Sequence, residues 1–313
     1  MAQRIVLAGG TGLIGAALAR RLRERGTEVV VLTRSTPRRR GDGVREVQWD
    51  AAAEPNAAAG QPAPAWWREL DGAQAVINLA GSTIDCVHTP ENKRRILTSR
   101  LESVRALGAA VRACATPPAV WVQTSAVGIY GNTEQRCAED APVGSSFKAD
   151  VCVQWEAAFA AACPAAVRSV VLRVGVVLAR KGGAYPPLAR VTKAFLGGAA
   201  GSGHQGISWI LLDDLEEIFL RAVNDSTMRG AYNACAPEPA SNAEFMHTLR
   251  EVLRRPWAPP APAFAIKLIA PLVMKTDANL VLEGQYAVPA RLVAENFRFK
   301  APRLVSALTA LAD

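Results

Sequence analysis

Short runs of β-branched and other apolar residues alternate, through the first half of the chain, with longer stretches whose apolar positions recur at helical spacing. This alternation is typical of a parallel sheet that is covered by helices. The expected strands are Arg4 to Ala8, Glu28 to Thr33, Arg45 to Trp49, Ala75 to Leu79, Ala119 to Ser125 and Ser169 to Val174. The pattern therefore predicts an α/β fold with a doubly wound parallel sheet.

The second half of the chain is less regular, because glycine pairs, a glycine-rich loop and a proline-rich stretch interrupt the pattern. We expect residues 1–178 to form the sheet domain, with residues 207–235 returning to it. Residues 179–206 and 236–313 are expected to form a smaller C-terminal lobe of mixed α and β elements. Residues 51–65 are rich in Ala, Pro and Gly and are expected to be an irregular surface connection.

A glycine-rich turn follows the first expected strand. Gly9-Gly10-Thr11-Gly12-Leu13-Ile14-Gly15 has the spacing G-x-x-G-x-x-G and leads into an amphipathic helix. In such a unit the first glycine permits a tight turn, the second lets the backbone approach a pyrophosphate, and the third lets the helix pack close to the strand. The helix N-terminus favours the anion. The unit predicts a dinucleotide-binding site in a Rossmann-type fold.

The end of the second strand indicates which dinucleotide binds. Sites that prefer NAD carry an acidic residue there for the ribose hydroxyls, whereas this chain carries Thr33 and Arg34. A guanidinium pairs with a 2′-phosphate and stacks on adenine, so NADP(H) is favoured over NAD(H). The alternative is that Arg34 is an ordinary solvated loop residue.

Charge and cysteine content narrow the possible partners. The net charge of +8 and the cluster Arg38-Arg39-Arg40 suit a ligand that carries several phosphates. No basic stripe is interleaved with aromatic residues, so nucleic acid is not expected. The six cysteines are scattered and include no C-x-x-C pair, so we expect no metal site and favour a reducing, cytoplasmic compartment. No apolar run has transmembrane length, so no membrane association is expected.

Further motifs follow in order along the chain: Asn78-Leu79-Ala80-Gly81, Ser125-Ala126-Val127-Gly128-Ile129-Tyr130-Gly131, Arg173-Val174-Gly175-Val176-Val177-Leu178 and Asp213-Asp214-Leu215. With the glycine turn they resemble the extended and atypical short-chain dehydrogenase/reductases related to NAD-dependent epimerases and dehydratases. Residues 92–100, 236–245 and 283–289 resemble a subgroup, often labelled epimerase-family proteins, that has a C-terminal domain of unknown function. The resemblance covers almost the whole chain.

The resemblance implies further ligand contacts. Leu79, Ala80, Gly81, Arg100 and Val177 would border the cofactor, and the segment that follows the last of these would help to form the pocket for a small-molecule substrate. The C-terminal lobe would therefore lie on the substrate side. Because relatives commonly dimerise through helices, a homodimer is a further expectation.

Catalysis is where the chain departs from the family. Members that perform redox chemistry use a Tyr as general acid/base, a Lys four residues later that lowers the Tyr pKa, and a Ser that polarises the carbonyl. Ser125 fits the Ser, but alignment on Glu156 places Lys148 and Cys152 at the Tyr and Lys positions. A phenol of pKa about 10 needs a nearby cation to work near neutrality, so the usual pair is absent. Tyr130 and Lys148 are the candidate replacements, whereas Cys152 is interpreted as a small buried residue.

Three functions remain in view. The leading hypothesis is an NADP(H)-dependent oxidoreductase that acts on a small carbonyl or hydroxyl substrate oriented by Ser125. A nucleotide-sugar epimerase or dehydratase is the second, and it is weakened by the missing Tyr and Lys. A non-catalytic NADP(H)-binding protein, which senses redox state or contacts a partner, is the third, and it accounts for an intact glycine turn beside a lost acid/base pair.

Overall fold

The computed structural model describes residues 3–52 and 63–312, and its central element is a seven-stranded parallel sheet. Its strands are β1 (Arg4–Ala8), β2 (Glu28–Thr33), β3 (Arg45–Gln48), β4 (Ala75–Asn78), β5 (Val120–Ala126), β7 (Arg168–Val174) and β11 (Gly230–Ala234). They lie in the order β11-β7-β5-β4-β1-β2-β3, and every neighbouring pair is parallel. The order reverses between β1 and β4, where doubly wound sheets bind their ligands. The predicted Rossmann-type α/β fold is confirmed.

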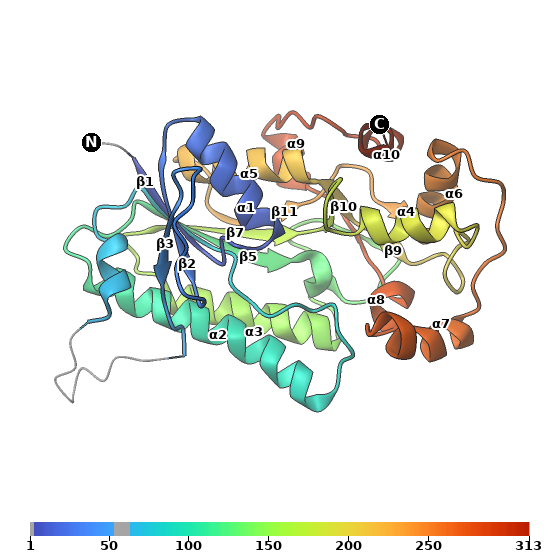
Figure 1. Cartoon of the computed structure of the whole chain (residues 1–313), viewed down its shortest axis with the longest axis horizontal. Coiled ribbons are helices and arrows are strands. Elements are labelled where there is room, and N and C mark those ends of the chain that lie inside the picture. Colours follow the sequence, from blue (N-terminus) through green and yellow to red (C-terminus); the bar gives the residue numbers. More distant parts are fainter. Residues whose placement is uncertain (1–2, 53–62, 313) are drawn as a thin grey trace.

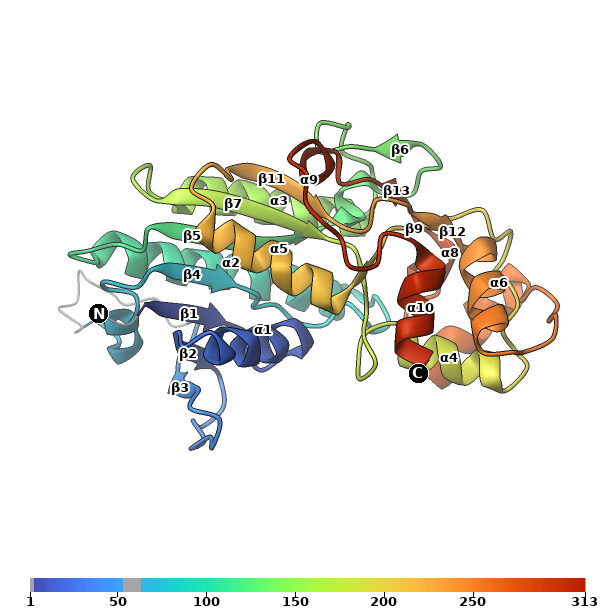
Figure 2. The ribbon, with the colours of Figure 1, turned by 90° about the horizontal axis from the view of Figure 1, so that it is seen from above.

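Helices cover both faces of this sheet, as Figures 1 and 2 show. They are α1 (Leu13–Glu24) and α5 (Leu212–Asn224) on one face, and α2 (Pro90–Ala113) and α3 (Phe147–Ala162) on the other. Each pair of helices shares a separate apolar core with the sheet, with Leu18 in the first and Trp121 in the second. Burial on both faces explains why the strands are almost continuously apolar.

The six expected strands are present, and each of their ends lies within one residue of its predicted position. The seventh strand, β11, was not among them. Its sequence Gly-Ala-Tyr-Asn-Ala contains glycine and asparagine, which have low β propensity. Pairing with β7 at the edge of the sheet stabilises it instead, and this long-range contact leaves no local signature.

The C-terminal lobe lies beyond the carboxyl ends of the strands (Figure 1). Its helical elements are α4 (Tyr185–Lys193), α6 (Asn242–Val252), α7 (Ala263–Ile269), η4 (Ala270–Met274), α8 (Asn279–Leu282) and α10 (Leu304–Ala312). Three short strand pairs accompany them: β8 (Val176–Leu178) with β10 (Trp209–Leu211), β9 (Gly206–Ile207) with β12 (Ala240–Ser241), and β6 (Arg136–Cys137) with β13 (Tyr286–Ala287). A third core, in which Trp209 and Phe245 are fully buried, joins α4, α6 and α10.

Part of the C-terminal segment returns to the sheet domain. α9 (Ala290–Ala294) packs on β11, and its Leu292 belongs to the core under α1 and α5. Phe297 and Phe299 pack against the same core. The structure therefore differs from the expected division, in which all of residues 236–313 belonged to the lobe. Most of the expected connection at 51–65 lies outside the described residues.

Candidate functional site

Two glycines of the turn are required by the packing of the backbone. Gly9 has a φ of +78°, and a Cβ added there would lie 2.8 Å from the backbone of Leu79 and Ala80. A Cβ on Gly15 would lie 2.5 Å from the Cα of Gly10. Both positions therefore need glycine whether or not a ligand binds.

Gly12 has no such structural reason to be glycine. Its φ is −76°, and an added Cβ would meet nothing closer than the carbonyl oxygen of Gly9 at 3.6 Å. It stands directly before α1, which has neither a side-chain cap nor an acidic residue in its first turn. By contrast, α2, α3 and α6 each begin with a Thr or Ser side-chain cap. The open space and the uncapped N–H groups of α1 suit an anion.

The other residues of the turn have different environments. Thr11 is exposed beside the open space. Gly10 faces Val31 of β2, with only 2.7 Å between the valine and an added Cβ. Ile14 packs against the core under α1. Thr11 is thus placed to meet a ligand, whereas the side chain of Ile14 serves packing.

The loop after β4 lies against the turn, as the resemblance implied. The side chain of Asn78 holds this loop, because its Oδ1 accepts a hydrogen bond from the N–H of Ala80 at 3.0 Å. Its Nδ2 donates to the buried Gln123 Oε1 at 3.0 Å. Leu79 and Ala80 are thereby fixed beside Gly9, at the point where the strand order reverses.

A second pair of glycines, Gly182 and Gly183, packs between Val177 and the start of α1. A Cβ on Gly183 would lie 2.4 Å from the carbonyl oxygen of Val177, and one on Gly182 would lie 3.1 Å from the side chain of Leu13. The sequence indicated Gly182 and Gly183 only as an interruption of the pattern. In the structure they bring the segment after β8 against the start of α1.

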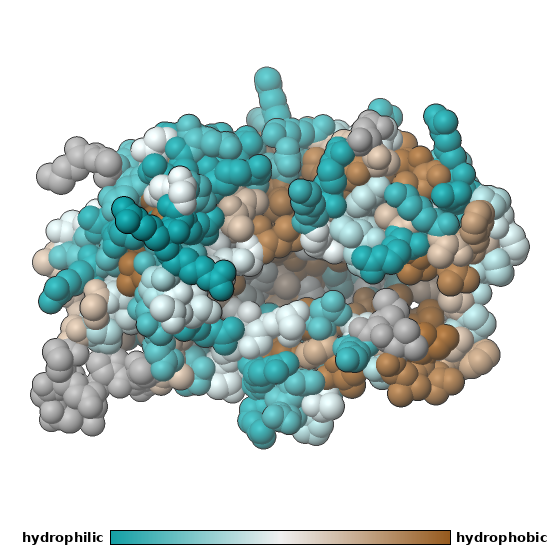
Figure 3. All heavy atoms as spheres, viewed as in Figure 1, coloured by the Kyte–Doolittle hydropathy of each residue, from teal (hydrophilic) through white to brown (hydrophobic). Residues whose placement is uncertain are grey.

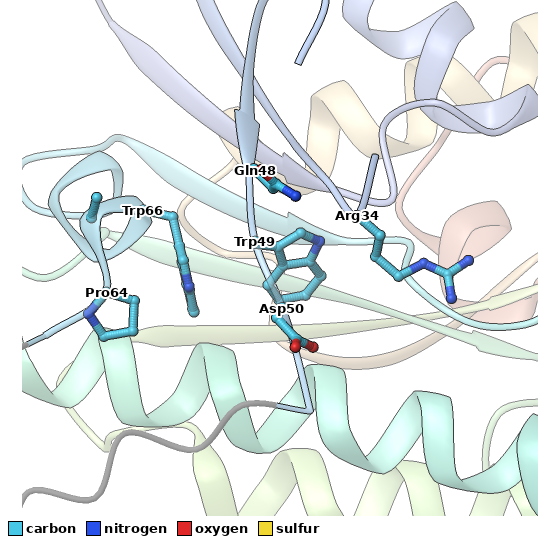
Figure 4. A pocket seen from close by; sticks show the side chains of 7 residues that line it. Arg34, Gln48, Trp49, Asp50, Pro64 and Trp66 are labelled. Atoms are coloured by element: carbon cyan, nitrogen blue, oxygen red, sulfur yellow. The ribbon is translucent and has the colours of Figure 1, made fainter. Parts of the chain in front are cut away.

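A cavity of about 510 Å³ opens at the ends of β2 and β3. Figure 4 shows Arg34, Trp49 and Asp50 beside it. Thr33 is buried, and its hydroxyl accepts a hydrogen bond from the N–H of Ser35, so it shapes the turn that presents Arg34. The lining residues are Arg34, Gln48, Trp49, Asp50, Pro64, Ala65 and Trp66. The cavity offers aromatic surface, an amide, a carboxylate and a guanidinium within one space.

Arg100 of α2 is a half-buried cation beside Gly81, whose added Cβ would lie 3.2 Å from the guanidinium carbon. Its Nη1 donates to the carbonyl oxygens of Ser82 at 3.1 Å and Ile96 at 2.8 Å, and its guanidinium lies over the Trp155 ring. Burial lowers its pKa. No carboxylate among the described residues pairs with it, so this desolvated charge favours an anionic ligand.

Ser125 lies at the carboxyl end of β5 in a buried polar network. Its Oγ donates to Glu156 Oε1 at 2.7 Å. Arg173 of β7 donates to both oxygens of Glu156, from Nε at 3.0 Å and from Nη2 at 2.9 Å. Burial lowers the pKa of Arg173, but its bonds and charge interaction with Glu156 raise it above its ordinary value overall. The ion pair therefore fixes the orientation of the Ser125 hydroxyl.

Tyr130 belongs to the same network and is almost fully buried. Its hydroxyl donates to Asn233 Oδ1 at 2.8 Å and accepts from Arg173 Nη1 at 3.0 Å. Burial raises its pKa although Arg173 opposes this. The phenol thus has both a donor and an acceptor partner within the protein, and this environment is that of a structural group.

Lys148 and Cys152, at the positions of the missing pair, lie in contrasting environments. Lys148 Nζ lies 3.4 Å from Glu283 and 3.5 Å from the carbonyl oxygen of Asn279, so it connects α3 to α8 of the lobe. Cys152 lies beside Ser125, and burial raises the pKa of its thiol to about 11. Cys152 is therefore a buried neutral group, whereas Lys148 forms an ion pair with the lobe.

Sequence reasoning missed the role of Glu156 and Arg173. Glu156 served only as an alignment anchor, and Arg173 only as part of a motif. A signal was present for Glu156, because it is the one charge in the apolar run from Val151 to Ala162 of α3. Buried charges are paired as a rule, so a cationic partner could have been expected. The choice of Arg173 could not, because β7 also contains Arg168.

Comparison with known proteins places the chain in a family. Residues 5–235 match the model of the NAD dependent epimerase/dehydratase family. The chain belongs to this family. Residues 261–311 match a domain of unknown function, DUF1731. The predicted resemblance, including the C-terminal domain, is confirmed.

Two relatives from this family align with nearly the whole of this chain. The epimerase family protein SDR39U1 of Homo sapiens is 34% identical over 311 residues, which cover 97% of this chain and 98% of that protein. A chloroplastic homolog from Arabidopsis thaliana is 34% identical over 310 residues, which cover 98% of this chain and 86% of that protein. Because one relative is chloroplastic, the expected cytoplasmic compartment stays a prediction.

Two solved structures of such proteins extend the comparison. The crystal structure of human SDR39U1 (isoform 2) with NADPH has a TM-score of 0.83 and 33% identity, and the match covers 99% of each chain. A nucleoside-diphosphate sugar epimerase from Corynebacterium glutamicum has a TM-score of 0.76 and 29% identity, over 100% of this chain and 58% of that one. Across residues 3–52 and 63–312, no helix is long and apolar enough to cross a bilayer.

Proposed function

We propose that this protein binds NADP(H) and transfers hydride between it and a small carbonyl or hydroxyl substrate. The observation that carries the cofactor assignment is the open space at Gly12, because the packing of the protein does not require a glycine at this position. A phosphate there meets the uncapped N–H groups of α1. The presence of NADPH in the structure of the human relative supports the same assignment.

The preference for NADP(H) over NAD(H) rests on Arg34 at the end of β2, and Arg100 adds a second cation beside Gly81. Arg34 lines the cavity at the end of β2, where a 2′-phosphate lies in NADP-binding sites of this fold. Trp49 offers an aromatic surface in the same cavity. Arg100 supplies a second cation, with no carboxylate partner among the described residues. Arginine pairs with phosphate oxygens through two N–H groups, so each of these cations suits the cofactor.

When bound, the cofactor would supply or accept the hydride, and Ser125 would contact the substrate oxygen. Because the Ser125 hydroxyl donates to Glu156, its Oγ offers a lone pair to a substrate hydroxyl. On oxidation, the substrate hydroxyl proton would pass to Ser125 Oγ as the Ser125 proton passes to Glu156, and reduction would return it by the same route. Arg173 holds Glu156 and is thereby a positioning residue for Ser125. Lys148 contributes a cation toward the lobe.

Calorimetric titration with NADPH, NADP⁺, NADH and NAD⁺ tests the cofactor assignment. We expect Gly12→Ala to weaken NADPH binding at least about tenfold, since the added methyl fills the space for the phosphate. Loss of glycine at the N-cap costs the helix only about 1 kcal/mol, so the variant still folds. Gly41→Ala is the control, because its Cβ meets nothing within 4 Å. Unchanged NADPH affinity in Gly12→Ala, or no binding by the wild type, would contradict the assignment.

A second candidate is a non-catalytic NADP(H)-binding protein, and the environments of the potential proton donors favour it. Tyr130 bonds to Asn233, Lys148 pairs with Glu283, and the Cys152 thiol has a pKa of about 11. Oxidation of NADPH with a panel of small aldehydes and ketones separates the two. Turnover that Ser125→Ala abolishes at unchanged NADPH affinity supports the enzyme, whereas binding without turnover across the panel supports the non-catalytic protein.

A nucleotide-sugar epimerase, the activity named for the Corynebacterium relative, is less well supported. Reversible proton removal needs an acid/base group, and the Tyr and Lys that supply it in the family are replaced here by Lys148 and Cys152. Formation of an isomer from UDP-sugars would reverse this ranking.

A further inference from the structure

Exposed apolar side chains gather on the helix that opens the C-terminal domain. Along α7 and η4, Phe264, Leu268, Ile269 and Leu272 are 76%, 65%, 49% and 71% exposed. Phe264 and Leu268 are four positions apart and so share one face of the helix. We call these four residues the α7 patch. Figure 3 shows brown, apolar surface at the lower right, where Figure 1 places α7.

Two neighbouring stretches add to this surface. Residues 195–201 run beside residues 255–263, since Ala200 and Ala261 form a β-bridge and the Arg255 guanidinium lies 5.2 Å from the centre of the Phe195 ring. Phe195, Leu196 and Trp257 in these stretches are also exposed. Of the eleven large apolar side chains exposed in the described residues, seven belong to the α7 patch and these two stretches. Clustering of this kind marks an interaction surface, whereas single exposed apolar residues are ordinary.

The α7 patch and the two stretches lie within longer segments whose charges have one sign, and one of these segments is bounded by Glu251 and Asp277. Residues 190–201 and 252–276 contain no Asp or Glu. They contain six cations, namely Arg190, Lys193, Arg254, Arg255, Lys267 and Lys275. Lys267 stands between Phe264 and Leu268 in the sequence and is itself exposed. A partner of this surface must therefore accept apolar side chains and carry negative charge.

We propose that the α7 patch inserts into the interface of a bilayer that contains anionic lipid. Apolar side chains on one face of a helix, flanked by Lys and Arg, are the features of helices that lie in the membrane plane. The negative headgroups attract the six cations, and the acyl region takes up Phe264, Leu268 and Leu272. The sequence-based expectation of no membrane association rested on the absence of a bilayer-spanning segment, and the proposal departs from it.

A second copy of the chain fits this surface less well. A symmetric dimer places the same patch against itself, so Lys267 would approach its own copy, and neither residues 190–201 nor residues 252–276 supply an acidic partner. Like charges juxtaposed across an interface oppose association. The residues of the α7 patch are also exposed over 49% to 76% of their surface. A fluid bilayer accommodates such side chains without a matching pocket.

Co-sedimentation of the full chain with vesicles tests the proposal. With phosphatidylcholine alone we expect little binding, and with added phosphatidylglycerol a bound fraction that falls as salt is raised. The double variant Phe264→Glu, Leu268→Glu is expected to lose binding at least about tenfold, and Lys267→Gln about fivefold, since each cation near an anionic surface contributes about that factor. Val143→Glu is the matched control, because this exposed valine lies outside the patch.

Thermal unfolding of each variant establishes that it is folded, and NADPH affinity provides a readout that the patch does not touch. The proposal is overturned if the wild type stays in the supernatant with both vesicle compositions, or if the double variant binds as well as the wild type. Concentration-dependent dimerisation that the double variant abolishes, without vesicle binding, assigns the surface to a second copy instead. Vesicle binding does not depend on the cofactor, so its failure is distinguishable from a failure of the proposed function.

Discussion

Removing the negative charge of Glu156 should destabilise the protein far more than removing a comparable surface charge. Glu156 accepts three hydrogen bonds, two from Arg173 and one from Ser125. Only 17% of its side chain and 11% of the Arg173 side chain are exposed. In Glu156→Gln the shape is kept, but the guanidinium of Arg173 loses its counter-ion inside the protein.

The magnitude follows from the burial of the pair and from the bonds that survive. Breaking a buried ion pair by removing one partner costs about 3–5 kcal/mol. Arg173 retains its bonds to the Tyr130 hydroxyl and the carbonyl oxygen of Glu139, so we expect the lower end, about 3 kcal/mol. Domains have free energies of unfolding of about 5–15 kcal/mol, and the variant therefore remains folded.

Urea unfolding at neutral pH measures this loss. Asp42→Asn is the control, because Asp42 accepts hydrogen bonds from Arg40 while 45% of its own side chain is exposed. Exposed pairs contribute about 1 kcal/mol or less. If the two variants lose equal stability, or if Glu156→Gln loses less than about 1 kcal/mol, the buried pair does not stabilise the fold as argued.

Two further predictions concern a buried thiol and a helix cap. At about pH 8, iodoacetamide should leave Cys152 unmodified in the folded protein, because burial raises the pKa of its thiol to about 11. Peptide mass spectrometry of the alkylated protein measures this modification. Rapid labelling of Cys152 would contradict the prediction and would show that the site opens. Ser241→Ala should cost about 1 kcal/mol in urea unfolding, since it breaks the capping box of α6. Hydrogen bonds from Ser241 lower the pKa of Glu244, so this stabilisation is present above the unfolded pKa and is lost as pH falls through the folded value. The difference between wild type and variant should therefore shrink in acid, and a constant difference would count against the coupling.

Local signals explain how much of the fold could be predicted from the sequence. The strand–turn–helix unit around Gly9 is encoded within one short segment, and β1 and β2 have the predicted bounds. The contacts that could not be predicted join distant segments. β11 depends on pairing with β7, and Leu292 packs in a core whose other members come mostly from the first two-thirds of the chain.

The candidate site divides in the same way. Gly12 and Arg34 could be singled out because spacing along the chain places them at the ends of β1 and β2. The environment of Ser125 could not, because Glu156 and Arg173 meet it from α3 and β7 across the sheet. Likewise, Tyr130 is close to Ser125 in sequence, yet its hydroxyl donates a hydrogen bond to Asn233 of the distant strand β11.

After the lobe, the chain returns to the sheet domain, and this limits where the protein can be truncated or its parts exchanged. β13 pairs with β6 and α9 covers β11, so the match to DUF1731 begins in the lobe but runs on through elements that complete the sheet domain. A fragment that ends at residue 235 would leave a hole where Leu292 lies and would expose the surface now covered by Phe297 and Phe299. The two family matches are therefore interlocked parts of one folding unit, and neither is an exchangeable module.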